Sequence, residues 1–139
     1  MAYSFLSRFR IKPGEEDRFI AAASRMEEQA PQEPGVLHFQ FFRLDEPHMF
    51  AVFESFTDEA ADKAHMEYEQ NKPLIAEMIE CMDGHYEREM LHDLEQVVAT
   101  FRDDAAFDTH MSIDFHDRLV PLIMECVEGE MSIAFYRSV

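Results

Sequence analysis

The sequence contains no tryptophan, only two cysteines and four glycines, and no apolar run longer than about six residues. Two cysteines cannot build a disulfide framework, which favours a reducing compartment. Apolar runs this short cannot span a bilayer, and the first residues alternate apolar and polar side chains instead of forming a basic and then apolar leader. We therefore expect a cytoplasmic protein without a membrane anchor.

Basic side chains are also scarce. The chain has 12 lysines and arginines against 29 aspartates and glutamates, which gives a net charge of −17, and the whole excess lies after residue 43. Such an acidic surface repels phosphate backbones and anionic lipid headgroups. We therefore expect no nucleic-acid partner and no role at a membrane surface, and we interpret the acidic residues as a solvated shell.

The signatures of several enzyme classes are missing as well. No GxGxxG, P-loop or Gly-x-Ser-x-Gly motif occurs, so nucleotide binding and serine hydrolysis have no support. Seven histidines and many carboxylates are potential metal ligands. No His-x-x-x-His or Glu-x-x-His set with a matching partner stands out, so we expect no metal.

What the sequence does contain is a series of short strands and amphipathic helices. Alternating side chains predict a strand over residues 3–11, which Pro13-Gly14 ends. Acidic residues 15–17 then open a helix, which is predicted by one apolar stripe at helical spacing and ended by Pro31, Pro34 and Gly35. Two further strands are predicted over residues 36–43 and 49–56. In the first of these, we expect Leu37, Phe39 and Phe41 to share one face.

A long helix and a fourth strand complete the first part of the chain. The helix is predicted from Asp58 to about Met82, with Pro73 either kinking it or starting a second piece, and the strand runs from His85 to Leu91. The resulting order βαββαβ predicts an α+β, ferredoxin-like antiparallel sheet with both helices on one face. The expected buried stripe of the long helix is Ala61, Ala64, His65, Tyr68, Ile75, Met78, Ile79 and Met82.

The C-terminal part of the chain resembles its central part in sequence. At an offset of 45, residues 56–84 align without a gap with residues 101–129, and ten of the 29 positions are identical. We therefore predict a ferredoxin-like domain over residues 1–92. Residues 93–139 are then a βαβ half-repeat of residues 48–92, packed on the same domain or on a partner chain. An unpaired half-repeat leaves an apolar face to cover, which favours a homodimer.

Four segments in this order resemble the antibiotic biosynthesis monooxygenase family, which includes quinol monooxygenases. They are RFRIKPGEEDRF (8–19), EPGVLHFQFFR (33–43), FAVFESF (50–56) and DEAADKAH (58–65). The resemblance implies a dimeric α+β barrel with a pocket between sheet and helices. It also implies oxidation by dioxygen without flavin, haem or metal, so no cofactor is expected. Relatives that degrade haem place a tryptophan in the pocket, and this chain has none.

A pocket of this kind needs a base, hydrogen-bond donors and an apolar wall. His65, on the sheet-facing stripe, is the candidate base, Tyr68 one turn along is a candidate donor, and Glu54 could orient the imidazole or form an ion pair. His110 is the counterpart of His65 in the repeat. Because Ile113 and Ala99 replace Tyr68 and Glu54 there, the first unit is favoured as the active one. The candidate substrate wall is Phe5, Phe39, Phe41 and Met78.

Three functions therefore remain open. The first is a cofactor-independent monooxygenase that oxidises a small aromatic or quinol substrate with dioxygen. The second is an isomerase-type enzyme that moves a proton next to a carbonyl, with His65 again as the base. The third is a non-catalytic homodimer that binds a small apolar ligand.

Overall fold

The computed structural model describes residues 2–92, 103–112, 120–121, 125 and 137–138. The chain divides into two compact units, one formed by Met1–Gln96 with Phe135–Val139 and the other by Val97–Ala134. The elements of the first unit are β1 (Tyr3–Arg10), α1 (Glu16–Gln29), a 3-10 turn (Ala30–Gln32), β2 (Val36–Arg43), β3 (Met49–Phe56), α2 (Glu59–Glu67), α3 (Lys72–Cys81), β4 (Glu87–Leu91) and β5 (Arg137–Ser138).

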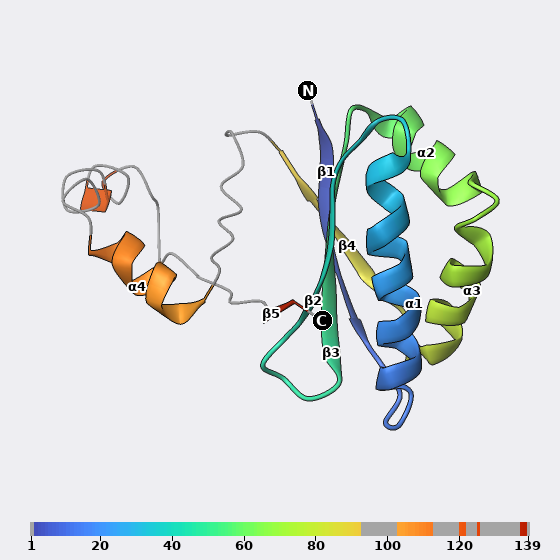
Figure 1. Ribbon diagram of the computed structural model, residues 1–139, viewed down its shortest axis with the longest axis horizontal. Helices are drawn as coiled ribbons and strands as arrows, with labels where there is room; N and C mark the ends of the chain where they lie inside the picture. Colours follow the sequence, from blue (N-terminus) through green and yellow to red (C-terminus); the bar gives the residue numbers. More distant parts are fainter. Residues whose placement is uncertain (1, 93–102, 113–119, 122–124, 126–136, 139) are drawn as a thin grey trace. The chain divides into compact units, whose positions relative to one another are not determined.

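The strands of the first unit form one antiparallel sheet in the order β4-β1-β3-β2-β5. The helices α1, α2 and α3 lie on one face of this sheet (Figure 1). The four long strands and the helices have the predicted ferredoxin-like order, so the predicted fold class is confirmed. The two-residue strand β5 adds an edge by pairing with Phe42 and Arg43 of β2.

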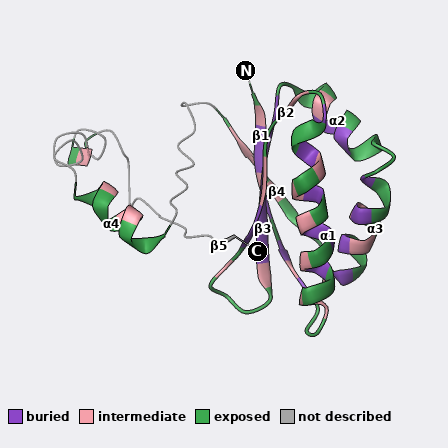
Figure 2. Cartoon of the chain, viewed as in Figure 1, coloured by how far each residue is buried: buried purple, intermediate pink, exposed green. Residues whose placement is uncertain are grey.

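The core lies between the sheet and the helices, where the alternation of the strands meets the apolar stripe of α1. Phe19 of α1 is fully buried and its ring centroid lies 5.3 Å from that of Phe9, 5.7 Å from Phe41 and 5.0 Å from Phe50. Figure 2 shows the buried positions of α1 and α3 on the sides of these helices that face the sheet. Such edge-to-face aromatic packing adds to the stabilisation from buried apolar area.

Strand β2 differs from its prediction at one residue. A β-bulge between Val36 and His38 shifts the pairing with β3, and Leu37 is 56% exposed. Because a bulge inserts one residue into the alternation, Leu37 does not share the face of Phe39 and Phe41. The expectation that Leu37 shares one face with Phe39 and Phe41 is therefore wrong.

The predicted long helix is two helices. Helix α2 ends at Glu67, Tyr68 follows in an extended conformation with ψ 124°, and α3 begins at Lys72 with Pro73 in its first turn. Proline is tolerated there because the first N–H groups of a helix have no intrahelical partner. The predicted stripe is wrong for Ala64, Tyr68 and Ile79, which are exposed. The break after Glu67 explains the exposure of Tyr68, which no longer continues the helix.

Helix α4 (Asp104–Met111) belongs to the second unit and begins as α2 does. The carboxylate of Asp58 accepts a hydrogen bond from the backbone N–H of Ala61 at 2.9 Å, and that of Asp103 accepts one from Ala106 at 2.8 Å. These residues are equivalent in the predicted repeat. The strands predicted around residues 95–100 and 131–136 lie outside the described residues.

Candidate functional site

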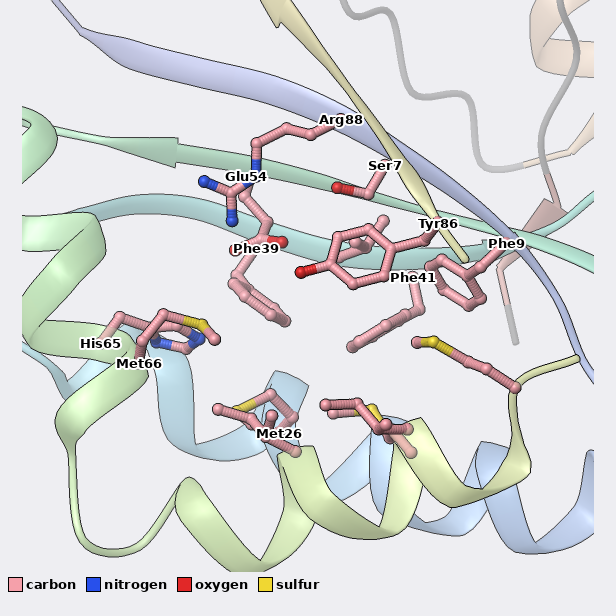
Figure 3. A pocket seen from close by; sticks show the side chains of 15 residues that line it. Ser7, Phe9, Met26, Phe39, Phe41, Glu54, His65, Met66, Tyr86 and Arg88 are labelled. Atoms are coloured by element: carbon pink, nitrogen blue, oxygen red, sulfur yellow. The ribbon is translucent and has the colours of Figure 1, made fainter. Parts of the chain in front are cut away.

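A pocket of about 80 Å³ lies between the inner face of the sheet and the helices (Figure 3). This is several times the volume of about 10–15 Å³ that a single water requires. Its lining is mostly phenylalanine and methionine with a few polar groups, an arrangement typical of small-molecule sites. The lining residues are Ser7, Phe9, Met26, Phe39, Phe41, Val52, Glu54, His65, Met66, Ile75, Met78, Ile79, Met82, Tyr86 and Arg88.

The mouth of the pocket is defined by the lining side chains that reach solvent. Met66 is 38% exposed, Tyr86 43% and Ile79 53%, whereas the Phe9, Phe41 and Met26 side chains inside are buried. Figure 3 shows the ring of Tyr86 lying over the space, with its hydroxyl end turned inward. Methionine side chains are flexible and polarisable, so the wall can adapt to planar ligands of different outline.

His65 is held by a buried polar cluster. Its Nδ1 lies 2.8 Å from Oε2 of Glu33, and the side-chain amide of Asn71 donates to Oε1 of Glu33 at 2.8 Å and to the backbone carbonyl of His65 at 3.0 Å. All three side chains are at most 7% exposed. A carboxylate can only accept hydrogen bonds, so Nδ1 carries the proton and Nε2 keeps a lone pair. None of the described residues bonds Nε2.

Two phenylalanine rings lie close to the imidazole of His65, which lines the pocket. Its ring centroid lies 5.0 Å from that of Phe39 and 5.5 Å from that of Phe56. His65 therefore combines a fixed tautomer, an apolar surrounding and contact with an open space, which is the arrangement that a general base requires.

Glu33 lies beside His65 because the turn before β2 approaches the first turn of α2 closely. Gly35 adopts φ +86°, and a Cβ at this position would lie 2.7 Å from Cβ of Ala61 and 2.9 Å from Oγ1 of Thr57. The carbonyl of Gly35 also accepts a hydrogen bond from the N–H of Thr57 at 2.8 Å. Only glycine fits this positive φ and this contact, so the turn before β2 can pack against the first turn of α2.

A second polar cluster lies on the sheet side of the pocket. Arg88 of β4 donates through Nη1 to Oδ2 of Asp62 at 3.0 Å, and its guanidinium carbon lies 3.7 Å from the ring centroid of Phe5. Glu54 of β3 is 8% exposed and lines the pocket, with no hydrogen bond to any other described residue. Burial raises the pKa of Glu54 to about 8, a change that Arg88 opposes and Asp62 reinforces.

The structure brings together most of the residues that the sequence singled out. His65, Glu54, Phe39, Phe41 and Met78 all line the pocket. Neither role expected for Glu54 is observed, because Glu33 orients the imidazole and Asp62 pairs with Arg88.

Three other candidates lie elsewhere. Tyr68 is 39% exposed at the end of α2 and does not line this pocket, and Phe5 is fully buried behind it, stacked on Phe56. His110 lies in the last turn of α4 in the second unit, and a second site around it stays a prediction.

Several polar residues of the site were missed. Arg88 could have been found from the alternation of β4, because it pairs with Ser7 and so shares the inner face. Glu33, Asn71 and Asp62 carry no such signal. Glu33 lies in a turn, Asn71 precedes α3, and Asp62 lies in the first turn of α2, so only tertiary packing places them against His65 and Arg88.

The described residues form neither a metal site nor a membrane-spanning helix. Within the described ranges, no three histidine, cysteine or carboxylate side chains gather into a group that could hold a metal ion. None of the described helices combines the length and the apolar character that crossing a bilayer requires.

The fold and the site define an α+β domain with a buried imidazole facing an apolar pocket. The sequence profile of the antibiotic biosynthesis monooxygenase family matches residues 3–77, more than half of the chain. The chain therefore belongs to this family, as its sequence segments predicted.

Solved structures agree on the fold. A protein from Bacteroides thetaiotaomicron assigned as an antibiotic biosynthesis monooxygenase is 24% identical, with a TM-score of 0.64, covering 72% of this chain and 96% of that one. One from Nitrosomonas europaea with the same assignment is 20% identical, with a TM-score of 0.63 and coverages of 68% and 91%. A conserved protein from Methanosarcina mazei is 20% identical, with a TM-score of 0.61 and coverages of 66% and 91%. No curated protein sequence matches the chain.

Proposed function

We propose that this protein oxidises a small hydroxylated aromatic compound with dioxygen, using His65 as the base and no bound cofactor. The observation that carries this proposal is the His65 imidazole, whose Nδ1 is held by Glu33 at 2.8 Å while the ring faces an apolar pocket. Family membership supports a monooxygenase-type reaction. The buried Glu33 carboxylate fixes the orientation of the His65 ring through Nδ1.

The proposed reaction balances without a further reductant. Nε2 of His65 takes the proton of the phenolic hydroxyl, and the electron-rich phenolate passes one electron to dioxygen. The aryloxyl radical and superoxide then combine at a ring carbon that carries a hydrogen, ortho or para to the oxygen. Loss of water from this peroxide leaves a quinone; one proton of the water is returned by the imidazolium and the other comes from the C–H of that ring carbon. One oxygen atom enters the product, the other leaves as water, and the ring supplies all four electrons.

The pocket favours each of these steps. Its phenylalanine and methionine lining admits apolar dioxygen and excludes most water, which protects the radical pair. The hydroxyl of Tyr86, at the mouth, is placed to donate to an anionic oxygen of the substrate, which is the role that the sequence analysis gave to Tyr68.

The test is oxygen consumption with a panel of hydroquinones and naphthols, measured on the purified protein and on His65→Ala. Loss of a general base is expected to lower the rate by about 10²- to 10⁴-fold. The control is His38→Ala, which removes an exposed histidine from β2 at a position that alternates with Phe39 and Phe41. Circular dichroism checks that both variants fold.

Two results would contradict the proposal. The wild-type protein could consume no oxygen with any member of the panel, or His65→Ala could match its rate. If the protein instead exchanges the α-protons of a ketone without consuming oxygen, it is the isomerase-type enzyme. If it binds aromatic compounds and does neither, it is a ligand-binding module.

We also propose a homodimer, which the family resemblance implies. Sedimentation of the full chain tests this, and a mass of 16.3 kDa at micromolar concentration would contradict it.

A further inference from the structure

Glu54 is a buried carboxyl group that the proposed chemistry at His65 does not use. It is 8% exposed, lines the pocket, and forms no hydrogen bond with another described residue. Buried polar groups are nearly always satisfied, so one that faces an open space without a protein partner points to a ligand. Figure 3 shows Glu54 on the sheet side of the pocket and His65 on the helix side.

Glu54 shares its neighbouring cation with another carboxylate. The charge of Arg88 attracts the carboxylate of Glu54, but the guanidinium donates its hydrogen bond to Asp62 at 3.0 Å and lies over the ring of Phe5. Its cross-strand neighbours are Phe5 of β1 and Phe39 of β2, which carry no charge. The charged or titratable groups around it are Arg88 of β4 and Asp62 of α2, and His65 and Tyr86 line the same pocket.

This environment favours the neutral acid. Burial is the largest cause of the rise in its pKa to about 8, and the negative charge of Asp62 adds to it. At neutral pH the group is therefore a carboxylic acid, which offers one O–H donor as well as its acceptors. An ionised carboxylate could only accept.

We infer that Glu54 donates a hydrogen bond to a carbonyl oxygen of the ligand and thereby selects planar aromatic compounds that carry a carbonyl group. The inference rests on the pocket of the proposed function and names the substrate class further. The ligand has an acidic hydroxyl for His65 and a carbonyl oxygen for Glu54, as hydroxylated aromatic ketones and hydroxyquinones have. A buried donor discriminates strongly against ligands that leave it unpaired.

The experiment measures binding, not turnover, with two probes of similar shape. Acetophenone carries a carbonyl oxygen that does not titrate, and ethylbenzene lacks it. Dissociation constants are measured by calorimetry or ligand-observed NMR at pH 7 and pH 9 for the wild type, Glu54→Gln and Glu54→Leu. Glutamine keeps a donor that does not titrate, whereas leucine removes it at similar volume.

A donor with a pKa of about 8 is about 90% protonated at pH 7 and about 10% at pH 9. We therefore expect the dissociation constant of acetophenone to rise about tenfold from pH 7 to pH 9 in the wild type. We expect no such rise in Glu54→Gln and no rise for ethylbenzene. Glu54→Leu should bind the two probes alike. Any pH dependence left in Glu54→Gln reports the other groups that face the pocket.

Four results would overturn the inference. They are equal binding of the two probes by the wild type at pH 7, an unchanged pH dependence in Glu54→Gln, a retained preference for acetophenone in Glu54→Leu, or no binding of either probe. If Glu54→Leu does not fold, the comparison of the wild type with Glu54→Gln still decides. Probe selectivity without oxygen consumption would refute the proposed oxidation alone. Oxygen consumption without probe selectivity would refute this inference alone.

Discussion

Oε2 of Glu33 and Nδ1 of His65 lie 2.8 Å apart, although the two residues are 32 positions apart in the sequence. Glu33 comes from the turn that precedes β2 and His65 from α2, and both side chains are buried. Asn71 donates to the other oxygen of Glu33 and so fixes the carboxylate as well. These hydrogen bonds hold the imidazole and the carboxylate in one arrangement.

Replacing Glu33 with glutamine should lower the rate of oxidation by about 10²-fold, with little change in KM. The amide has almost the shape of the carboxylate, but it cannot stabilise the imidazolium that forms when His65 takes a proton. Steady-state oxygen consumption measures this effect, and acetophenone binding should stay unchanged. Glu59→Gln, which alters an exposed carboxylate on α2, the helix that carries His65, is the control and should keep the wild-type rate. A Glu33→Gln variant as fast as the wild type would show that the pair has no catalytic role.

The stability of the protein should depend on pH through Glu54. Its folded pKa of about 8 lies above the ordinary value of 4.5, so the folded state holds one more proton than the unfolded chain between these pH values. The contribution to the free energy of unfolding is therefore fully present below pH 4.5 and is lost as the pH rises to about 8, by up to about 1.4 kcal/mol per pH unit.

Glu54→Gln removes this titrating group. The stability advantage of the wild type over the variant, measured as free energy of unfolding, should therefore shrink by about 2–4 kcal/mol between pH 5 and pH 8. Urea unfolding at several pH values measures it. Glu87→Gln, an exposed carboxylate on β4, should show no such trend. An advantage that stays constant across the window would mean that Glu54 is ionised in the folded protein throughout.

Gly35→Ala should destabilise the protein more than Gly14→Ala. Both glycines have φ near +90°, so both substitutions carry the same backbone strain of about 1 kcal/mol. Only at Gly35 would the new Cβ meet other atoms, at 2.7 Å from Ala61, which adds about 1–3 kcal/mol. Thermal or urea unfolding of the two variants measures the difference. Oxygen consumption should fall only in Gly35→Ala, because the contact that places Glu33 against His65 is displaced; equal behaviour of the two variants would contradict this.

Phe19→Ala should cost about 3–5 kcal/mol of unfolding free energy, because it leaves a cavity among Phe9, Phe41 and Phe50. Leu37→Ala is the matched control and should cost less than about 0.5 kcal/mol, since Leu37 is 56% exposed at the bulge. Urea unfolding measures both. A large loss in Leu37→Ala would mean that this side chain is covered in solution.

The strands and the first helix could be predicted because their signals are local. The predicted bounds of β2 and β3 are those observed, since alternation within a strand and glycine or proline at its ends depend only on neighbouring residues. The failures share one cause. The bulge at Leu37 and the break after Glu67 both interrupt a pattern. Leu37 and Tyr68, at the interruptions, leave the predicted face, whereas Phe39, Phe41 and Met78 beyond them keep it.

For the site, the sequence by itself determined that His65 faces the sheet and that phenylalanine and methionine surround it, because these follow from periodicity along one element. Only the tertiary structure decided which carboxylate holds the imidazole. From the sequence, Glu54 was a candidate either for that role or for an ion pair, but Glu33 holds the imidazole because Gly35 lets the turn before β2 approach α2. Contacts between segments far apart in the chain depend on how the backbones pack in space. The spacing of residues along the sequence does not determine that packing.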